Sequence, residues 1–216
     1  MDFRFTDDQQ SIQELSRKIF ETEVSEDSWK ELESSGEWLH RKVWNALGQA
    51  ELIGIALPVE YGGGGMGLVE LGILLKEQGR VAAPIPLMHS AGVAAMTIAE
   101  FGSDELKSRV LRSIASGESI VTAALTAGGR FDPGRPDVQA TKSGDGYVLT
   151  GSSSCVAALP VSESVLVAAG TDAGVGLFLV DPKAEGASLE AQTTTSFEEQ
   201  ALLNLHEVRV ASTDVV

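Results

Sequence analysis

Residues 101–126, FGSDELKSRVLRSIASGESIVTAALT, contain the point at which the apolar period of this chain changes. Ser103 is a favourable N-cap for a helix that runs to about Ala115. After Gly117, Ile120 to Leu125 form a short β-branched run of the kind found in strands. The stretch therefore predicts a helical part before about residue 118 and a β part after it.

The part before residue 118 carries the 3.6-residue apolar period of helices. Thr6 and Gln9 have the spacing of a capping box, which predicts a helix over about residues 7–23. Further apolar stripes predict helices around residues 43–47, 68–79, 86–101 and 103–115. A helical N-terminal domain over residues 1–118 follows.

Short β-branched runs separated by Gly, Pro, Asp and Ser clusters follow residue 118. They cover residues 120–125, 147–150, 165–169, 175–180 and 207–210. Because helical patterns do not separate them, these runs predict an antiparallel β-barrel or sandwich over residues 119–216. The expected fold class is α+β, with two domains in this chain.

Composition narrows the class of protein. The chain has 216 residues, 43% of them hydrophobic, and a formal net charge of -15, which opposes binding to nucleic acid or to anionic membranes. Cys155 is the only cysteine, so an intrachain disulfide is impossible and a reducing compartment is expected. The N-terminus lacks the pattern of a signal peptide, and no apolar stretch has the length of a membrane span. We expect a cytoplasmic protein.

The glycine-rich stretch YGGGGMG places Gly62, Gly64 and Gly67 at the GxGxxG spacing of dinucleotide-binding loops. Such a site needs a strand running into the glycines and an acidic residue about 20 positions later. Pro58 interrupts the approach, and residues 80–99 contain no Asp or Glu. The interpretation we favour is a flexible turn between two helices.

Neither a nucleophile nor a metal site stands out. Catalysis by Cys155 would need a base, and His40, His89 and His206 share no local signature with it. A buried small hydrophobic residue is the commoner role of a lone cysteine. The histidines are scattered, and one cysteine cannot supply a metal cluster. We therefore expect no metal and no catalytic residue in this chain.

Taken in order, several segments resemble the acyl-CoA dehydrogenases. FTDDQQSIQELSRKIF (residues 5–20) resembles the first helix of that family. LIGIALPVEYGGGGMGLVELGILLKEQGR (residues 52–80) is similar to its Leu-Pro-x-x-Tyr-Gly-Gly loop and the following helix. Residues 101–126 resemble the passage into the β-domain, GDGYVLTG (residues 144–151) the hairpin after it, and LLNLHEVRV (residues 202–210) its closing strand. The likeness spans essentially residues 1–216.

The resemblance implies a flavoenzyme of three domains, usually assembled as a dimer or tetramer. FAD lies between the middle domain and a C-terminal four-helix bundle, and it helps to remove two hydrogens from an acyl-CoA. The catalytic base of the family is a glutamate from the C-terminal part. This sequence stops at Val216, about where that part should begin, so we expect the bundle and the base to be absent from this chain.

Departures from the family pattern fall at the residues that contact the flavin. The family has Thr-Glu-Pro followed by Gly-Ser-Asp; here Leu125 and Thr126 match, while residues 127 and 128 are Ala-Gly and no Gly-Ser-Asp follows. Where the family has Trp-Ile-Thr beside the flavin ring, this chain has Cys155, Val and Ala157. The resemblance thus assigns Leu125, Thr126, Cys155 and Ala157 to a cofactor site that has lost an aromatic wall and a hydroxyl group.

These departures resemble the flavin-poor subunits of heteromeric acyl-CoA dehydrogenases. The resemblance implies FAD-dependent α,β-dehydrogenation of an acyl-CoA in fatty acid or steroid side-chain degradation, with FAD bound weakly or shared with a partner subunit. Two alternatives stay open. One is a complete FAD-binding homo-oligomeric enzyme, and the other is a non-enzymatic acyl-CoA or protein-interaction module.

Overall fold

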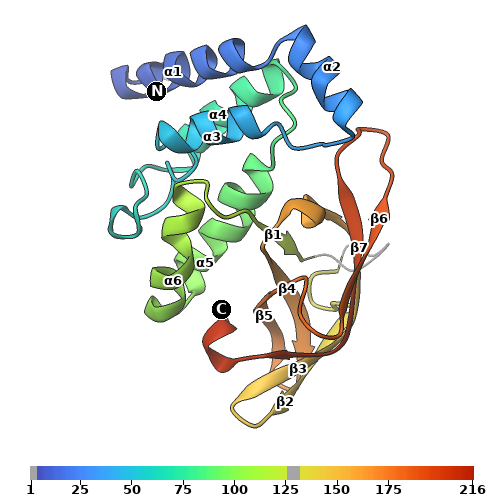
Figure 1. The fold of residues 1–216 in the computed structure, drawn as a ribbon. Coiled ribbons are helices and arrows are strands. Elements are labelled where there is room, and N and C mark those ends of the chain that lie inside the picture. Colours follow the sequence, from blue (N-terminus) through green and yellow to red (C-terminus); the bar gives the residue numbers. More distant parts are fainter. Residues whose placement is uncertain (1–3, 126–131) are drawn as a thin grey trace.

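A computed structural model describes residues 4–125 and 132–216. A helical part comes first and a curved β-sheet follows (Figure 1), so the expected order of the two parts is confirmed. The helices are α1 (Asp7–Glu23), α2 (Glu26–Ser35), α3 (Arg41–Gln49), η1 (Val59–Tyr61), α4 (Leu68–Arg80), η2 (Met88–Ala95), α5 (Met96–Phe101) and α6 (Asp104–Ala115). The strands are β1 (Val121–Ala124), β2 (Val138–Ser143), β3 (Gly146–Ala157), β4 (Ser164–Thr171), β5 (Gly174–Val180), β6 (Ala187–Gln192) and β7 (Gln200–Val210). Two short 3₁₀ turns, η3 (Leu159–Val161) and η4 (Ser212–Asp214), complete the elements.

Helix α1 has the predicted bounds and the predicted cap. The backbone N–H of Gln9 donates to Thr6 Oγ1 at 3.2 Å, and the N–H of Thr6 donates to Gln9 Oε1 at 3.1 Å. The helix buries Phe20 in a core that it shares with α3 and α4, including Trp44 and Leu74. Helix α2 was not predicted, because none of its residues is buried and it carries no apolar stripe.

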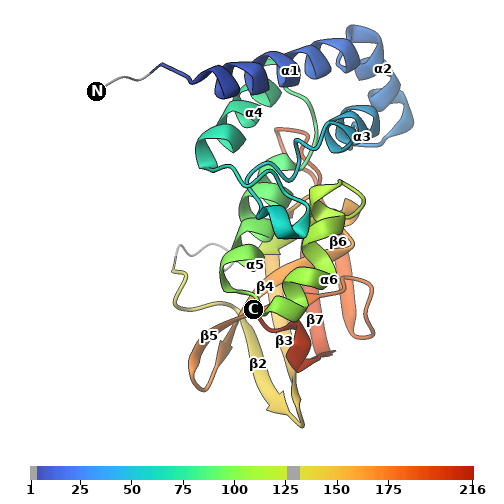
Figure 2. The same cartoon turned by 90° about the vertical axis from the view of Figure 1, so that its left-hand side faces the viewer.

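The segment predicted as one helix over residues 86–101 is helical but not uniformly α-helical. Met88–Ala95 forms wider π-type turns, and α5 continues from Met96. The segment is rich in small side chains, among them Ala91 and Gly92. Figure 2, turned by 90°, and Figure 1 both show α5 and α6 next to the sheet, where Ile98 and Leu106 share a core with Val121 of β1.

The sheet is mixed rather than purely antiparallel. Its strand order is β1-β4-β2-β3-β7-β6, and β5 pairs with β4. The pairs β2–β3, β3–β7, β6–β7 and β4–β5 are antiparallel as predicted, whereas β4 runs parallel to both β1 and β2. The reason is that β1 and β2 follow each other along the same edge of β4 in the same direction.

Apolar side chains from β2, β3, β4, β5 and β7 form the core of the sheet, among them Leu149, Val167, Phe178 and Leu203. The rings of Tyr147 and Phe178 meet edge to face, with centroids 5.0 Å apart. Among the described residues, no helix combines the length and the apolar character needed to cross a membrane.

The glycine-rich loop lies between η1 and α4, and no strand leads into it. A Cβ on residue 63 would lie 2.2 Å from the carbonyl oxygen of Leu57, so glycine is required there by close backbone contact. The interpretation as a turn between two helices therefore holds, and the loop lacks the strand that a dinucleotide site needs.

Candidate functional site

The candidate site lies where the chain leaves the sheet between β1 and β2. β1 pairs with residues 164–167 of β4, and β2 pairs with residues 169–170 of the same strand. On the other side, β3 pairs with β2 through residues 146–150, and its second half continues past the end of β2. There Thr122 Oγ1 of β1 donates to the carbonyl of Ala157 at 2.6 Å, so β1 and the end of β3 lie together.

A β-bulge shapes β3 at this place. The pairing of β3 with β7 shifts between Ser153 and Val156, and Cys155 adopts a left-handed conformation with φ 57°. This conformation costs a residue with a Cβ about 1 kcal/mol, so local contacts must stabilise the backbone there. The N–H of Cys155 donates to Gln192 Oε1 at the end of β6, at 2.8 Å. The bulge leaves Cys155 exposed while Ser153 and Val156 are buried.

The end of β3 is rigidly held by hydrogen bonds. Ala157 is 8% exposed and its carbonyl is occupied by Thr122. Ala158 also has a left-handed φ of 56°; its N–H donates to the carbonyl of Glu199 at 2.8 Å, and its carbonyl accepts from Ser162 Oγ at 2.7 Å. The carbonyl of Ala157 and the N–H and carbonyl of Ala158 therefore already have hydrogen-bond partners within the protein.

The helical part reaches this site through η2. Buried Ser90 accepts a hydrogen bond from the N–H of Val121 at 3.3 Å. Next to it, His89 Nε2 lies 2.9 Å from Glu198 Oε1 in the segment between β6 and β7. The other oxygen of Glu198 accepts from Gln200 Nε2 at 2.9 Å. The sheet, the π-type helix and the β6–β7 segment thus converge around the bulge.

The structure describes three of the four residues that the resemblance assigned to a cofactor site. Leu125 directly follows β1 and is half-buried, and Thr126 lies outside the described residues. Cys155 and Ala157 lie two positions apart at the bulge. The hydrogen bond from Thr122 places the β1 segment that precedes Leu125 beside them.

Among the described residues, no hydrogen bond joins any of the three histidines to Cys155. His40 is buried in the helical part and caps α3, His89 pairs with Glu198, and His206 is exposed on β7. Across residues 4–125 and 132–216, no three His, Cys, Asp or Glu side chains gather as metal ligands.

Sequence reasoning missed the residues that hold the bulge. Gln192 is 37 positions from Cys155, and Thr122 is 35 positions from Ala157. No periodic pattern or motif connects such positions. No local pattern predicts that Glu198 Oε1 lies 2.9 Å from His89 Nε2 either.

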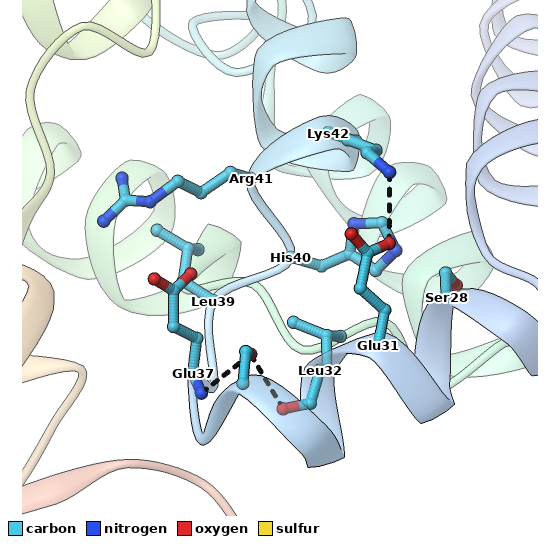
Figure 3. A pocket seen from close by; sticks show the side chains of 9 residues that line it. Ser28, Glu31, Leu32, Glu37, Leu39, His40, Arg41 and Lys42 are labelled. Carbon is cyan, nitrogen blue, oxygen red and sulfur yellow. Dashed lines mark hydrogen bonds and ion pairs between the residues drawn. The ribbon is translucent and has the colours of Figure 1, made fainter.

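A separate concavity of about 200 Å³ lies between α2 and the start of α3 (Figure 3). Its lining carries two cations and two carboxylates: Arg41, Lys42, Glu31 and Glu37. Lys42 Nζ binds Glu31 at 3.2 Å, so the opposite charges offset one another and the concavity favours neither anions nor cations.

Comparisons with known proteins agree with this architecture. The model of the acyl-CoA dehydrogenase N-terminal domain matches residues 6–118. Acyl-CoA dehydrogenase FadE27 of Mycobacterium tuberculosis is 33% identical over 210 residues, which are 97% of this chain and 55% of the relative. A structure of the ChsE4–ChsE5 complex from the same organism covers all of this chain and 58% of its own, with a TM-score of 0.93 and 33% identity. A Tcur3481–Tcur3483 steroid ACAD structure is 36% identical, covers 94% of this chain and 56% of its own, and has a TM-score of 0.88. The chain spans about half the length of the curated relatives it matches.

Proposed function

This chain belongs to the acyl-CoA dehydrogenase family, and on that premise we propose that it works as a subunit in FAD-dependent α,β-dehydrogenation of an acyl-CoA, with a degenerate flavin site of its own. Members of the family bind FAD, and a glutaryl-CoA dehydrogenase of the same fold has been seen with FADH2. In this proposal the flavin is bound weakly by this chain or is shared with a partner subunit that keeps the flavin contacts.

The observation that carries the proposal is the chemistry of the β3 bulge. Cys155 offers no ring to stack on a flavin, and Ala157 offers no hydroxyl. The N–H of Cys155 is engaged by Gln192 and the carbonyl of Ala157 by Thr122. The side chains of Cys155 and Ala157 therefore do not fit a tightly held flavin, although hydrogen bonds hold the backbone around them in place.

The missing contacts are large enough to matter. Loss of ring stacking corresponds to roughly 0.5 to 1.5 kcal/mol, and loss of one neutral hydrogen bond to about the same. Together they weaken binding by roughly tenfold to a hundredfold before any loss at the pyrophosphate. The relatives whose structures were solved as complexes, ChsE4–ChsE5 and Tcur3481–Tcur3483, support the idea of a second subunit.

The test is to purify the chain alone and together with an acyl-CoA dehydrogenase chain that retains the family's flavin contacts. We expect a colourless protein alone, a yellow complex with the partner, and acyl-CoA oxidation only by the complex. A Cys155→Trp/Ala157→Thr variant of the chain should bind added FAD roughly tenfold more tightly, measured by quenching of flavin fluorescence. The gain is limited because a tryptophan at this left-handed position is strained.

Cys155→Leu/Ala157→Val is the matched control, because it adds bulk without a ring or a hydroxyl, and its FAD affinity should stay at that of the wild type. If the chain alone holds stoichiometric FAD and oxidises an acyl-CoA, it is a complete enzyme and the proposal fails. If neither the chain nor the complex binds FAD or acts on acyl-CoA, the chain is an acyl-CoA or protein-interaction module.

A further inference from the structure

An open groove of about 440 Å³ lies between the helical part and the segment that joins β6 to β7, residues 193–199. Two half-buried tryptophans line its helical side, Trp29 of α2 and Trp38 of the α2–α3 connection, and Phe197 lines the other side. Figure 1 shows the β6–β7 turn beside the end of α2. The volume falls within the range of roughly 300 to 1,000 Å³ that is usual for sites of small organic molecules.

Both sides of the groove are held in place by hydrogen bonds within the chain. On the helical side, the amide of Gln78 donates to the carbonyls of Ala83 and Ile85 at 3.0 and 2.8 Å. On the other side, backbone N–H groups at the end of β3 donate to the side chain of Gln192 and to the carbonyl of Glu199, one at each end of the β6–β7 segment. The groove is therefore formed before anything binds, as ligand sites usually are.

The lining of the groove offers no free charge. Among its described residues Glu198 alone is charged, and both of its oxygens are engaged, one by His89 and the other by Gln200, each at 2.9 Å. The hydroxyl of Ser196 lies 3.2 Å from that of Thr194. A charged ligand would lose its hydration here without gaining an ion partner, so the groove favours a neutral occupant.

Aromatic rings on both sides of the groove favour a flat occupant. Between the rings of Trp29, Trp38 and Phe197, the lining is completed by apolar side chains that include Leu75 and Ile85. A flat ring system gains from burial of its apolar surface and, in addition, from stacked or edge-to-face contact with aromatic side chains. A flexible alkyl chain would gain from burial alone and would lose more conformational freedom on binding.

Phe197 is presented at the groove in an unfavourable state. It is the most exposed of the large hydrophobic residues among those described, with 87% of its surface accessible, and its left-handed φ of 59° is rare for a bulky residue. Thr194 stabilises the turn, because its carbonyl accepts from the N–H of Phe197 at 3.3 Å and its Oγ1 donates to the carbonyl of Glu198 at 2.9 Å. Backbone strain of this kind is concentrated at sites that bind ligands, and a ligand in the groove would cover the exposed ring.

We propose that this groove binds a neutral, apolar molecule with a flat ring system, which stacks between the tryptophans of the helical part and Phe197. The site is distinct from the β3 bulge, since neither Cys155 nor Ala157 lines it. Its test therefore does not depend on the proposed flavin chemistry.

Titration of the full chain with a pair of related dyes tests the proposal. N-phenyl-1-naphthylamine is neutral and its emission rises in apolar surroundings; 1-anilinonaphthalene-8-sulfonate has the same rings and an added negative charge. High salt screens the net charge of -15, so that this charge contributes little to the comparison. We expect saturable binding of the neutral dye with a stoichiometry of about one, and an affinity at least about tenfold higher than that of the sulfonate.

Competition measures the preference for rings. Naphthol and decanol have the same number of carbon atoms and one hydroxyl group each, but the carbon atoms of decanol form a flexible chain. We expect naphthol to displace the neutral dye at a concentration at least about fivefold lower than decanol.

Two glycines of α4 connect the signal to the groove. A Cβ at Gly79 or Gly72 would meet no atom within 4 Å, and Gly79 lines the groove whereas Gly72 does not. Gly79→Gln should therefore fill part of the groove and weaken binding of the neutral dye about tenfold, and Gly72→Gln, the matched control, should leave it within about twofold. Both variants should keep α4 folded, because glutamine favours a helix more than glycine does.

A second pair of variants examines the aromatic side chain. Phe197→Asn removes the ring, and asparagine tolerates the left-handed conformation, so the turn should keep its fold. Binding of the neutral dye should weaken about fivefold through the loss of stacking. Phe101→Asn is the matched control, because Phe101 is also exposed but belongs to α5, and its affinity should stay within about twofold of the wild type.

Three results would overturn the proposal. The first is a neutral dye that gives no saturable signal, and the second is equal binding in the Gly79→Gln and Gly72→Gln variants, which would place the dye elsewhere on the chain. The third is displacement of the dye by decanol as readily as by naphthol. In that case the groove takes any apolar chain, such as a segment of a partner protein, and is not a site for a ring compound.

Discussion

The buried carboxylate of Glu77 in the helical part and the β3 bulge in the sheet differ in how hydrogen bonds are used. In the helical part, the carboxylate of Glu77 is fully buried and accepts hydrogen bonds from Gln13 at 2.9 Å, from Arg17 at 3.0 and 3.1 Å, and from Arg80 at 2.9 Å. At the β3 bulge, Cys155 is exposed in a left-handed conformation and is held through its backbone by Gln192.

The difference separates what stabilises the chain from what its site can do. The hydrogen bonds of Glu77 with Gln13, Arg17 and Arg80 join α1 to α4. They leave no lone pair of the carboxylate for a ligand, so this cluster has a structural role. The bulge keeps a demanding backbone geometry while its side chains are small and carry little chemistry. A strained backbone with few functional side chains supports the proposal that this site has lost flavin contacts while its fold persists.

The largest expected effect is on the helical side of this comparison. Glu77→Ala should lower the free energy of unfolding by about 3 kcal/mol, because it leaves two guanidinium groups and an amide without their acceptor and opens a cavity. Denaturation by urea at neutral pH measures it. Glu14→Ala, on the exposed side of α1, is the control and should change stability by less than about 0.5 kcal/mol. A Glu77→Ala loss as small as that of the control would remove the contrast.

Acid should act on the same cluster. The hydrogen bonds from Arg17 lower the pKa of Glu77 to about 2, below its usual value of 4.5, against the opposing effect of burial. The unfolded chain therefore takes up this proton first, so stability is present above about pH 5 and is lost as the pH falls toward 2. The stability advantage of the wild type over Glu77→Gln should shrink by roughly 3 kcal/mol across that window. Denaturation curves at several pH values measure it, and parallel pH profiles for the two proteins would contradict the assignment.

The same contrast explains how far the sequence could predict the structure. Helix α1 was predicted with its bounds because its cap and its apolar face are both local signals. Strand β6 was missed because it is exposed along nearly all of its length and depends on pairing with β7. The partners of the bulge are side chains that only the folded sheet brings together, as with Gln192 and Cys155. Resemblance to a family could assign Cys155 and Ala157 to a site, but it could not show which backbone groups there are already engaged.

On the sheet side, the expected effect is smaller and local. Gln192→Ala removes the hydrogen bond to the N–H of Cys155, which is worth about 1 kcal/mol. Exchange of that amide with solvent should speed up about fivefold, and global stability should fall by no more than about 1 kcal/mol. Hydrogen exchange followed by NMR measures it. Glu190→Ala, on the same strand, removes a hydrogen bond to Asn204 instead and should leave the Cys155 amide unchanged. Equal exchange in both variants would show that the bulge does not depend on Gln192.

The smallest expected effect belongs to His40, which caps α3 from within the helical core. Its Nδ1 accepts from the N–H of Val43 at 3.4 Å, while its buried Nε2 has no hydrogen-bond partner among the described residues. Burial lowers the pKa of His40, and nearby Lys42 lowers it further, although the carboxylate of Glu23 acts in the opposite direction. Because the unfolded chain binds this proton more readily, the contribution of His40 is complete above its ordinary pKa of about 6.5 and declines as the pH falls below it.

His40→Asn removes the titration but keeps an oxygen that can cap the helix. The free energy of unfolding of the wild type should therefore fall relative to this variant between about pH 7.5 and about pH 5.5, before Glu77 begins to titrate. His206→Asn, the same substitution at an exposed position on β7, is measured beside it as the control. If His40→Asn and the wild type keep the same difference across this interval, protonation of His40 does not oppose folding, and the acid sensitivity of the helical part belongs to Glu77 alone.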